Sequence, residues 1–444
     1  MKIRLDEAFD AGAWPGPAGP SGASAGESWV GPLGFLGMLE TSLGRSGPGI
    51  PGSAREAALI PLLRDRAGFW SASAQVDPLQ TARRLLGWRD LLCLHGWKGE
   101  PVSPRLGALA ELTREVLPGL PDRLQAVLEA LGSRSAEVAS VELLGPRASL
   151  PKLWREVLTA LEGHGTAVIE VPLVDAPAQG DLQAARGAGF APTGDGSIQL
   201  LRARAPIEAA DEVGAFLAAL PDLDGVVVIG ADTLLDAALR RHGVPTLGAQ
   251  ALPGDNALLQ ILPLVLSLGW EPADPQRALE LLTLPISPVP PALARRLAEA
   301  LHQTPAVGSE AWNQVLQDGL EAVEDPDRRE RLRTRLAGIF EATLPIGGAY
   351  PVDALRARTR LLQQWIQGRA SMDPDRAELY QGAIRQCLAL EELVTRARME
   401  ALPEPLIRRY VEEATAHASA PALHPAQAGV GSVQDPGALG GPAR

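Results

Sequence analysis

The chain has 444 residues, of which 46% are hydrophobic and 21% are charged, proportions typical of a folded globular protein with more than one domain. Lys and Arg together number 41 against 53 Asp and Glu, so the net charge is −12. This negative net charge argues against a protein whose whole surface binds phosphate groups. A local basic groove is compatible with it. The two cysteines, Cys93 and Cys387, lie far apart without a CxxC motif, which excludes a disulfide framework and a cysteine-based metal site.

The sequence shows no pattern typical of a targeting signal or a membrane-spanning segment. Its N-terminal stretch lacks the apolar core of a signal peptide, and no uninterrupted apolar run reaches the roughly 18 to 20 residues of a membrane-spanning helix. We therefore expect a cytoplasmic protein without membrane contacts.

The first part of the chain combines helices with one β-α-β unit. Residues Gly12 to Gly31 are rich in Gly, Pro, Ser and Ala and indicate a loop or linker. Apolar periodicity predicts a helix over 33–43 and continuous helical structure over 55–131. Short strands at 140–143 and 166–172 flank an amphipathic helix at 150–161, an order that predicts a parallel strand pair.

A second alternation of strands and helices follows. It comprises a strand at 197–203, a helix at 206–220, a strand at 225–230 apolar enough to be buried on both faces, and a helix at 232–242. The prolines at 285, 288, 290 and 291 then interrupt any helix. Around them the pattern is helical, at residues 258–268, 275–282, 291–301, 312–323, 326–342, 352–368, 375–397 and 403–416. The tail from Ala418 to Arg444 is again rich in Pro, Gly and Ala, with one strand-like piece at 430–433.

A search for catalytic patterns finds no convincing constellation. No GxxxxGK[ST] phosphate loop occurs, and the GxSxG at 22–26 and the GxGxxG at 47–52 fall in Gly-rich loops without a preceding strand. The six histidines show no metal-ligand spacing, and the acidic pairs Glu412–Glu413 and Asp222–Asp224 have no lysine nearby. We therefore assign no catalytic, nucleotide-binding or metal-binding residue and no cofactor.

Basic stretches at 328–335, 356–360 and 295–296 lie on expected helices. Acidic residues alternate with these arginines, so ordinary solvated helix faces are one interpretation and contact with nucleic acid is the other. Arg328, Arg331 and Arg335 share one helix face because they are spaced by three and four residues. The nine tryptophans fall mostly on apolar helix faces, which favours core packing over base stacking.

The order of elements resembles that of superfamily 1 helicases, in which two RecA-like domains each carry a helical insertion. The segments that carry the resemblance are Ile207–Leu217, Val226–Asp232, Leu234–Pro245 and Val430–Gly441. The resemblance implies an α/β fold, predominantly helical, with two RecA-like parallel-sheet domains. It implies these bounds: 1–45 with 134–196 for a degenerate first domain, 46–133 for its helical insertion, 197–283 for the second domain, 284–425 for the second insertion, and 426–444 for a truncated return.

Within that superfamily, residues 29–44 and 82–91 resemble the helicase-like half of AddB-like proteins of the PD-(D/E)XK nuclease family. This resemblance implies a role in double-strand break repair, a family activity of ATP-dependent exonuclease and helicase, and three partners: DNA, a nuclease domain or downstream polypeptide, and an AddA-like helicase subunit. Because no nuclease segment precedes Arg444, we expect the chain to supply only the helicase-like part.

Three departures from active helicases predict a chain without catalysis of its own. The linker at 12–31 has no phosphate loop, Gly230 stands where active relatives carry an arginine, and residues 438–442 lack the family's lysine. We expect a non-catalytic scaffold that holds DNA with Arg328, Arg331 and Arg335. Two alternatives stay open: residual nucleotide binding, and a helical protein-interaction scaffold with no salt-dependent DNA affinity.

Overall fold

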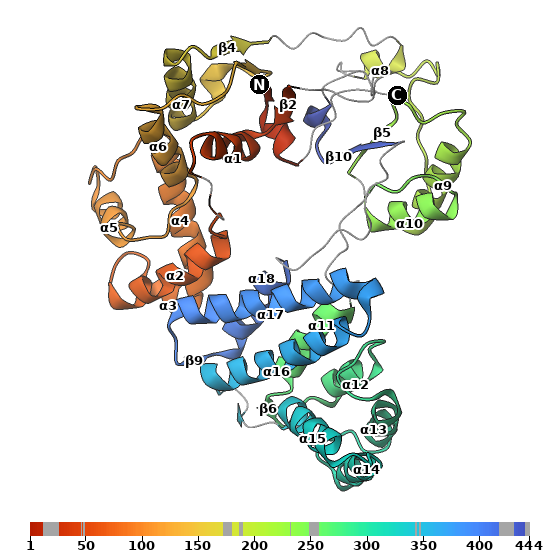
Figure 1. The fold of residues 1–444 in the computed structure, drawn as a ribbon. Coiled ribbons are helices and arrows are strands. Elements are labelled where there is room, and N and C mark those ends of the chain that lie inside the picture. The colour runs from red at the N-terminus through yellow and green to blue at the C-terminus, as the bar shows by residue number, and fades with distance from the viewer. Residues whose placement is uncertain are drawn as a thin grey trace.

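The computed structural model shows a predominantly helical chain with a small parallel sheet of four strands (Figure 1). No helix among the described residues combines the length and the apolarity that crossing a bilayer requires. The structure describes residues 1–11, 26–45, 47, 49–171, 180–185, 190–230, 232–247, 257–341, 344–345, 348–416 and 430–439.

The four-stranded sheet lies at the N-terminal end of the fold. Its strands are all parallel, in the order β2-β1-β3-β4. Ile3 and Leu5 of the central strand and Val141 and Leu143 of its neighbour alternate into a core that α1, α6 and α7 complete. The β-α-β unit expected from the sequence is therefore confirmed. The bounds are β1 Lys2–Leu5, β2 Glu27–Val30, β3 Ser140–Leu143, β4 Ala167–Glu170, α1 Pro32–Ser42, α6 Leu120–Leu131 and α7 Lys152–Gly163.

One sequence expectation about this sheet is wrong. Residues 27–30, expected to belong to the linker, form β2, because the open edge of β1 offers them hydrogen-bond partners along its whole length. The rest of that linker, 12–25, lies outside the described residues. Helix α6, which the expected bounds place in the 46–133 insertion, shares a hydrophobic cluster with the sheet through Leu124, Val127 and Leu131.

A second, smaller unit contains a parallel pair of strands, β5 (Val227–Ile229) and β10 (Gly431–Val433), beside α9 (Pro206–Ala218) and α10 (Thr233–Arg241). The strand expected at 430–433 is thus present and pairs with a segment some 200 positions earlier in the sequence. The two helices approach closely at Gly214, where a Cβ would lie 2.9 Å from His242 Cδ2. A side chain there would push the helices apart.

Two expectations for this unit are also wrong. Residues 197–203 form no strand and leave Leu200 77% exposed, because the described part of this unit gives them no strand to pair with. The strand expected to be buried on both faces leaves Ile229 45% exposed, because the cluster of Phe9 and Val433 that covers this face takes in Val227 and stops short of Ile229.

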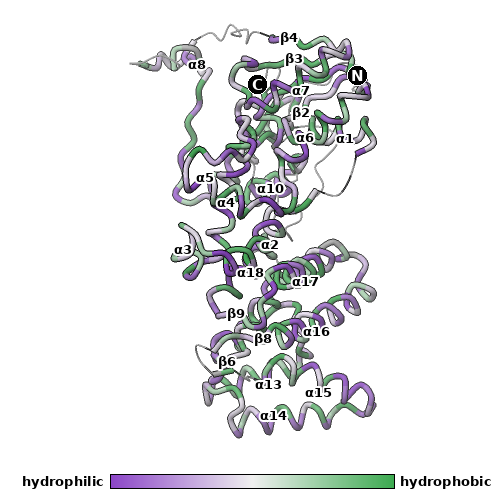
Figure 2. Tube along the Cα trace, turned by 90° about the vertical axis from the view of Figure 1, so that its left-hand side faces the viewer, coloured by the Kyte–Doolittle hydropathy of each residue, from purple (hydrophilic) through white to green (hydrophobic). Residues whose placement is uncertain are grey.

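Twelve further helices of the described part of the chain share one hydrophobic core, although they come from two distant parts of the sequence. Helix α2 packs on both α4 and α17, which joins the earlier group to the later one (Figure 1). Along these helices hydrophobic and hydrophilic residues alternate, as Figure 2 shows, since one face of each helix lies in the shared core. The earlier group is α2 Gly52–Asp65, α3 Ser71–Val76, α4 Pro78–Leu94 and α5 Pro104–Leu112. The later group is α11 Ala257–Ser267, α12 Pro275–Thr283, α13 Pro291–Gln303, α14 Glu310–Glu321, α15 Pro326–Phe340, α16 Val352–Ala370, α17 Ala377–Ala397 and α18 Glu404–Ala416.

This shared core changes the expected division of the chain. Helices α11 and α12, placed by the expected bounds in the 197–283 domain, bury Leu262, Val265 and Leu281 in the helical core instead. The apolar face of α11 packs on α16, α17 and α18, and α12 packs on α11 and α13. Short elements complete the description: η1 Glu7–Ala11, η2 Arg147–Ser149, α8 Asp181–Ala184, β6 Trp270–Glu271, β7 Leu344–Pro345, β8 Tyr350–Pro351, η4 Pro374–Arg376, β9 Ala401–Leu402 and η5 Pro436–Ala438.

One ion network links the two groups of helices. Arg83 on α4 donates to both carboxylate oxygens of Glu56 on α2, at 2.9 and 3.0 Å, and also to Glu413 on α18. The hydrogen bonds to Glu56 and then to Glu413 raise the pKa of Arg83 above its ordinary value. The carboxylate side chains are only 11% and 18% exposed, so the shared guanidinium neutralises charge where water is scarce.

Replacing this guanidinium tests its contribution to the packing. We expect Arg83→Met to lower the free energy of unfolding of the helical core by about 1–3 kcal/mol, because Glu56 and Glu413 then face each other without the cation between them. Arg333→Met, which breaks only the exposed pair with Glu330, should change it by less than about 0.5 kcal/mol. Urea unfolding followed by circular dichroism measures both, and equal effects of the two variants would contradict the assigned role.

Candidate functional site

Helix α15 carries the arginines that the sequence singled out. Asp325 caps it, accepting hydrogen bonds from the backbone N–H of Asp327 and Arg328 at 2.9 and 3.1 Å, and Pro326 follows at the first helical position. The hydrogen bond from Arg328, with smaller contributions from Asp327 and the nearby arginines, lowers the pKa of Asp325. Leu332, Leu336, Ile339 and Phe340 anchor the inner face of the helix in the core, which leaves the arginines on its other faces.

The arginines of α15 fall into two groups. Arg329 donates to the Val323 carbonyl at 2.9 and 2.7 Å, and Arg333 pairs with Glu330 at 2.6 Å. Arg328, Arg331 and Arg335 instead line one pocket together. The structure therefore brings the three predicted residues to the same place.

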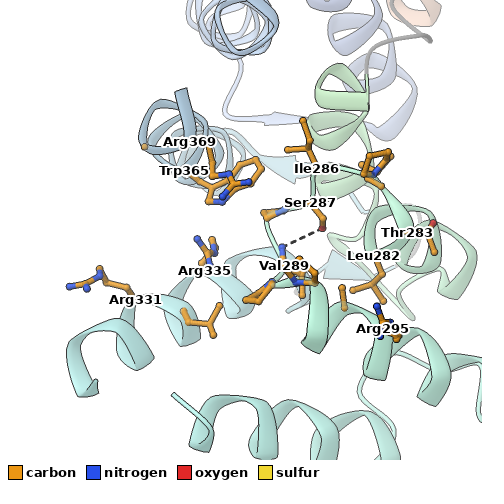
Figure 3. Close-up of a pocket in the computed structure, with 18 of the residues that line it drawn as sticks. Leu282, Thr283, Ile286, Ser287, Val289, Arg295, Arg331, Arg335, Trp365 and Arg369 are labelled. Atoms are coloured by element: carbon orange, nitrogen blue, oxygen red, sulfur yellow. Dashed lines mark hydrogen bonds between the residues drawn. The ribbon is translucent and has the colours of Figure 1, made fainter. Parts of the chain in front are cut away.

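The pocket has a volume of about 860 Å³ and lies among α13, α15, α16 and the segment between α12 and α13 (Figure 3). It is at the end of the molecule away from the four-stranded sheet, as both views show (Figures 1 and 2). Arg295 from α13 and Arg369 from α16 add two more guanidinium groups, and Trp365 from α16 adds an aromatic ring. No carboxylate belongs to the described lining of this pocket.

The segment between α12 and α13 gives the pocket a stiff wall. Prolines at 285, 288 and 290 fix its backbone angles, and the Val289 N–H donates to Ser287 Oγ at 3.3 Å. Helix α12 ends at Thr283 and α13 begins at Pro291, so the interruption expected from the prolines is confirmed. A wall with fixed backbone angles loses little conformational entropy when a ligand binds.

The five pocket arginines have no close carboxylate partner among the described residues, and the nearest acidic influence is the longer-range interaction of Asp325 with Arg328 and Arg331. Across the described ranges, no ion pair or side-chain hydrogen bond joins Arg295, Arg328, Arg331, Arg335 or Arg369 to another residue. Arg331 extends outward from α15, while Arg335 rises toward Trp365 and Arg369 (Figure 3). The pocket therefore offers Arg335 and Arg369 together to an anion, with Arg331 at its outer edge.

Arg335 is the least solvated of the five. Its Nε is buried without a hydrogen-bond partner. Burial, and secondarily the positive charge of Arg369, lowers the pKa of Arg335, although a guanidinium with this pKa still carries its charge at neutral pH. A buried donor and a pair of facing cations are both unfavourable in the free protein, and a bound anion would relieve both.

Sequence reasoning found part of this site and missed part. Arg369 and Trp365 carry no local signal, since they lie on a different helix from the predicted three and reach the pocket only through packing. Of the other basic stretches, Arg295 enters the pocket, whereas Arg296 pairs with Asp318 at 2.8 Å. The stretch at 356–360 is structural: Arg358 is buried and donates to the backbone carbonyls of Val265 and Glu341.

The N-terminus of α1 follows a strand of the parallel sheet. Unlike the arginine pocket, it has a carboxylate bound to its hydrogen-bond donors. Asp10 Oδ1 accepts hydrogen bonds from the backbone N–H of Leu33 and Gly34 at 2.9 and 3.4 Å. In nucleotide-binding folds, a phosphate takes such a position. Here a carboxylate of the chain already occupies those donors and would repel a phosphate.

Neither a metal site nor a reactive thiol is found among the described residues. Within the described ranges, no three His, Cys, Asp or Glu side chains come close enough to hold a metal ion. Cys387 is buried, and burial raises the pKa of its thiol to about 12, so the thiol stays protonated.

No model of a known protein family matches this chain, and no curated protein is detectably similar to it.

Stability measurements can test whether Arg335 is held at an energetic disadvantage. We expect Arg335→Met to be as stable as the wild type or up to about 1 kcal/mol more stable in a buffer without multivalent anions, because the substitution removes a desolvated charge and an unpaired donor. Adding sulfate should then raise the unfolding midpoint of the wild type more than that of the variant. A loss of more than about 1 kcal/mol without sulfate would show that Arg335 is a structural residue.

Proposed function

We propose that this chain is a non-catalytic, helicase-like DNA-binding scaffold of an AddB-like helicase-nuclease acting in double-strand break repair. The observation that carries the proposal is the pocket of five arginines, Arg328, Arg331 and Arg335 among them, whose described lining contains no carboxylate.

The chemistry of this pocket suits the backbone of a nucleic acid. Guanidinium groups bind phosphate oxygens in a bidentate manner, and several of them converging in one pocket match a polyanion better than a single small ion. The chain is acidic overall, with a net charge of −12, so a basic site at one place would orient DNA toward it. Trp365, half-buried on the pocket wall, offers a ring on which an unpaired base can stack.

The arrangement of strands supports the helicase-like part of the proposal. One unit has four parallel strands, and β10 returns to pair with β5 after the long helical stretch between them. We propose that these units are two degenerate RecA-like domains, and that the shared helical core carries the DNA contacts. An AddA-like helicase subunit and a nuclease domain would supply the catalytic steps.

Binding of DNA at two salt concentrations tests the proposal. We expect a forked DNA with a single-stranded tail to bind, with an affinity that falls on the order of 100-fold between 50 and 200 mM salt if all five arginines contact phosphates. Each of Arg328→Ala and Arg331→Ala should lower the slope of log K against log salt by about 0.7. Fluorescence anisotropy measures both quantities.

Arg333→Ala is the matched control for these variants, because Arg333 lies on the same helix but pairs with Glu330 outside the pocket. It should leave affinity and slope unchanged. If the chain does not bind the DNA, or binds it with an affinity independent of salt concentration, the alternative of a protein-interaction scaffold is favoured.

Thermal unfolding with and without Mg-ATP tests the nucleotide-binding alternative. A ligand present at 100 times its Kd adds about 2.7 kcal/mol to the free energy of unfolding. We expect no such gain, because Asp10 occupies the donors at the start of α1. A saturable, ATP-specific rise of the unfolding midpoint would instead establish residual nucleotide binding.

A further inference from the structure

A second hollow lies between α3, α4 and α5, which we name the α3–α5 groove. Its volume is about 870 Å³, and apolar side chains form most of it, including Phe69, Trp70, Trp88 and Leu109. None of these residues belongs to the arginine pocket.

The groove exposes large apolar side chains. Phe69 is 41% exposed, Trp88 is 50% exposed and Val76 is 87% exposed. Single exposed apolar residues are ordinary on protein surfaces, but several lining one hollow mark a surface that binds something.

Helix α4 has an inner and an outer face, and both are built for packing. Leu79, Ala82 and Leu86 point into the shared core and are almost fully buried. Gln80, Arg84, Trp88 and Leu92, each four residues after the last, form a stripe along the groove. This stripe spans about 18 Å at 1.5 Å per residue, which is the length of roughly three turns of a partner helix.

The walls of the groove are held in place before any partner binds. The Asp77 side chain accepts the Gln80 N–H at 2.9 Å and so caps α4. The Trp70 Nε1–H donates to the Arg66 carbonyl at 3.1 Å, and the Trp70 ring packs edge-on against Phe69. A preformed groove loses little entropy on binding.

Charge indicates which kind of partner fits. The groove is lined by two arginines, Arg84 and Arg105, and by one carboxylate, Asp77, whose oxygen is engaged in capping. Arg105 lies 5.8 Å from the centre of the Phe69 ring, and neither arginine forms an ion pair within the described part of the chain. An apolar floor with cations at its edge complements apolar side chains flanked by acidic ones.

We propose that the α3–α5 groove docks an amphipathic helix of a partner protein, about three turns long, with apolar residues on one face and Asp or Glu beside them. The apolar face packs on Trp88, Phe69 and Val76, and the acidic residues pair with Arg84 and Arg105. This inference is independent of the DNA-binding role, since it uses a different surface.

A labelled model peptide tests the proposal with the full chain. The probe is a helical peptide with Leu at positions i, i+4 and i+7 flanked by Glu, and the comparison peptide carries Lys in place of each Glu. We expect the acidic peptide to bind with at least tenfold higher affinity than the basic one in fluorescence anisotropy. Trp88→Ala should weaken its binding at least tenfold, and Arg84→Glu should remove the preference for the acidic peptide.

Leu91→Ala is the matched control, because Leu91 is a 57% exposed residue on the same helix that does not line the groove. It should leave peptide binding unchanged, and circular dichroism confirms that each variant is folded. No binding, equal binding of both peptides, or equal effects of Leu91→Ala and Trp88→Ala would overturn the proposal. Self-association of the wild type that Trp88→Ala abolishes would also overturn it, since the occupant would then be a second copy of the chain.

Discussion

The packing of α2 against both α4 and α17 is the constraint on which the arrangement of this molecule depends. It joins helices that lie some 300 positions apart into a single hydrophobic core, in which Leu59 and Ile60 of α2 and Leu390 and Val394 of α17 are all buried. Arg83 reinforces the junction by holding carboxylates of α2 and α18 together. Both surfaces proposed to bind partners are outer faces of this core. Their walls are therefore only as well ordered as the core that carries them.

An arginine at the helical junction and an arginine in the pocket have opposite effects on the stability of the free protein. Arg83 has two carboxylate partners, so its charge stabilises the fold. Arg335 has a buried Nε without a partner and faces Arg369, so its charge is a disadvantage to the free protein. Groups held at such a disadvantage are expected where a ligand completes the interaction. This contrast is the reason why Arg335, and not Arg83, is proposed to bind a ligand.

The helices could be predicted closely, whereas the strands could be predicted only in part. Pro at the first turn and Asp or Ser caps mark the starts of α4, α5 and α15 because these signals act within a few residues. Residues 27–30 look like linker yet form β2, and residues 197–203 look like a strand yet form none. A strand needs an edge to pair with, and that edge comes from elsewhere in the chain. The RecA-like character of the two parallel units is accordingly a proposal that their topology supports.

The sequence by itself determined that Arg328, Arg331 and Arg335 share a face, because the helical repeat places residues three and four apart side by side. It also determined the break between α12 and α13, because proline cannot continue a helix. Only the tertiary structure decided that Arg295, Arg369 and Trp365 join those three, and that Arg329 and Arg333 are engaged elsewhere. The physical reason is that periodicity encodes contacts within one helix. Which residues meet across helices depends on how their buried faces pack together.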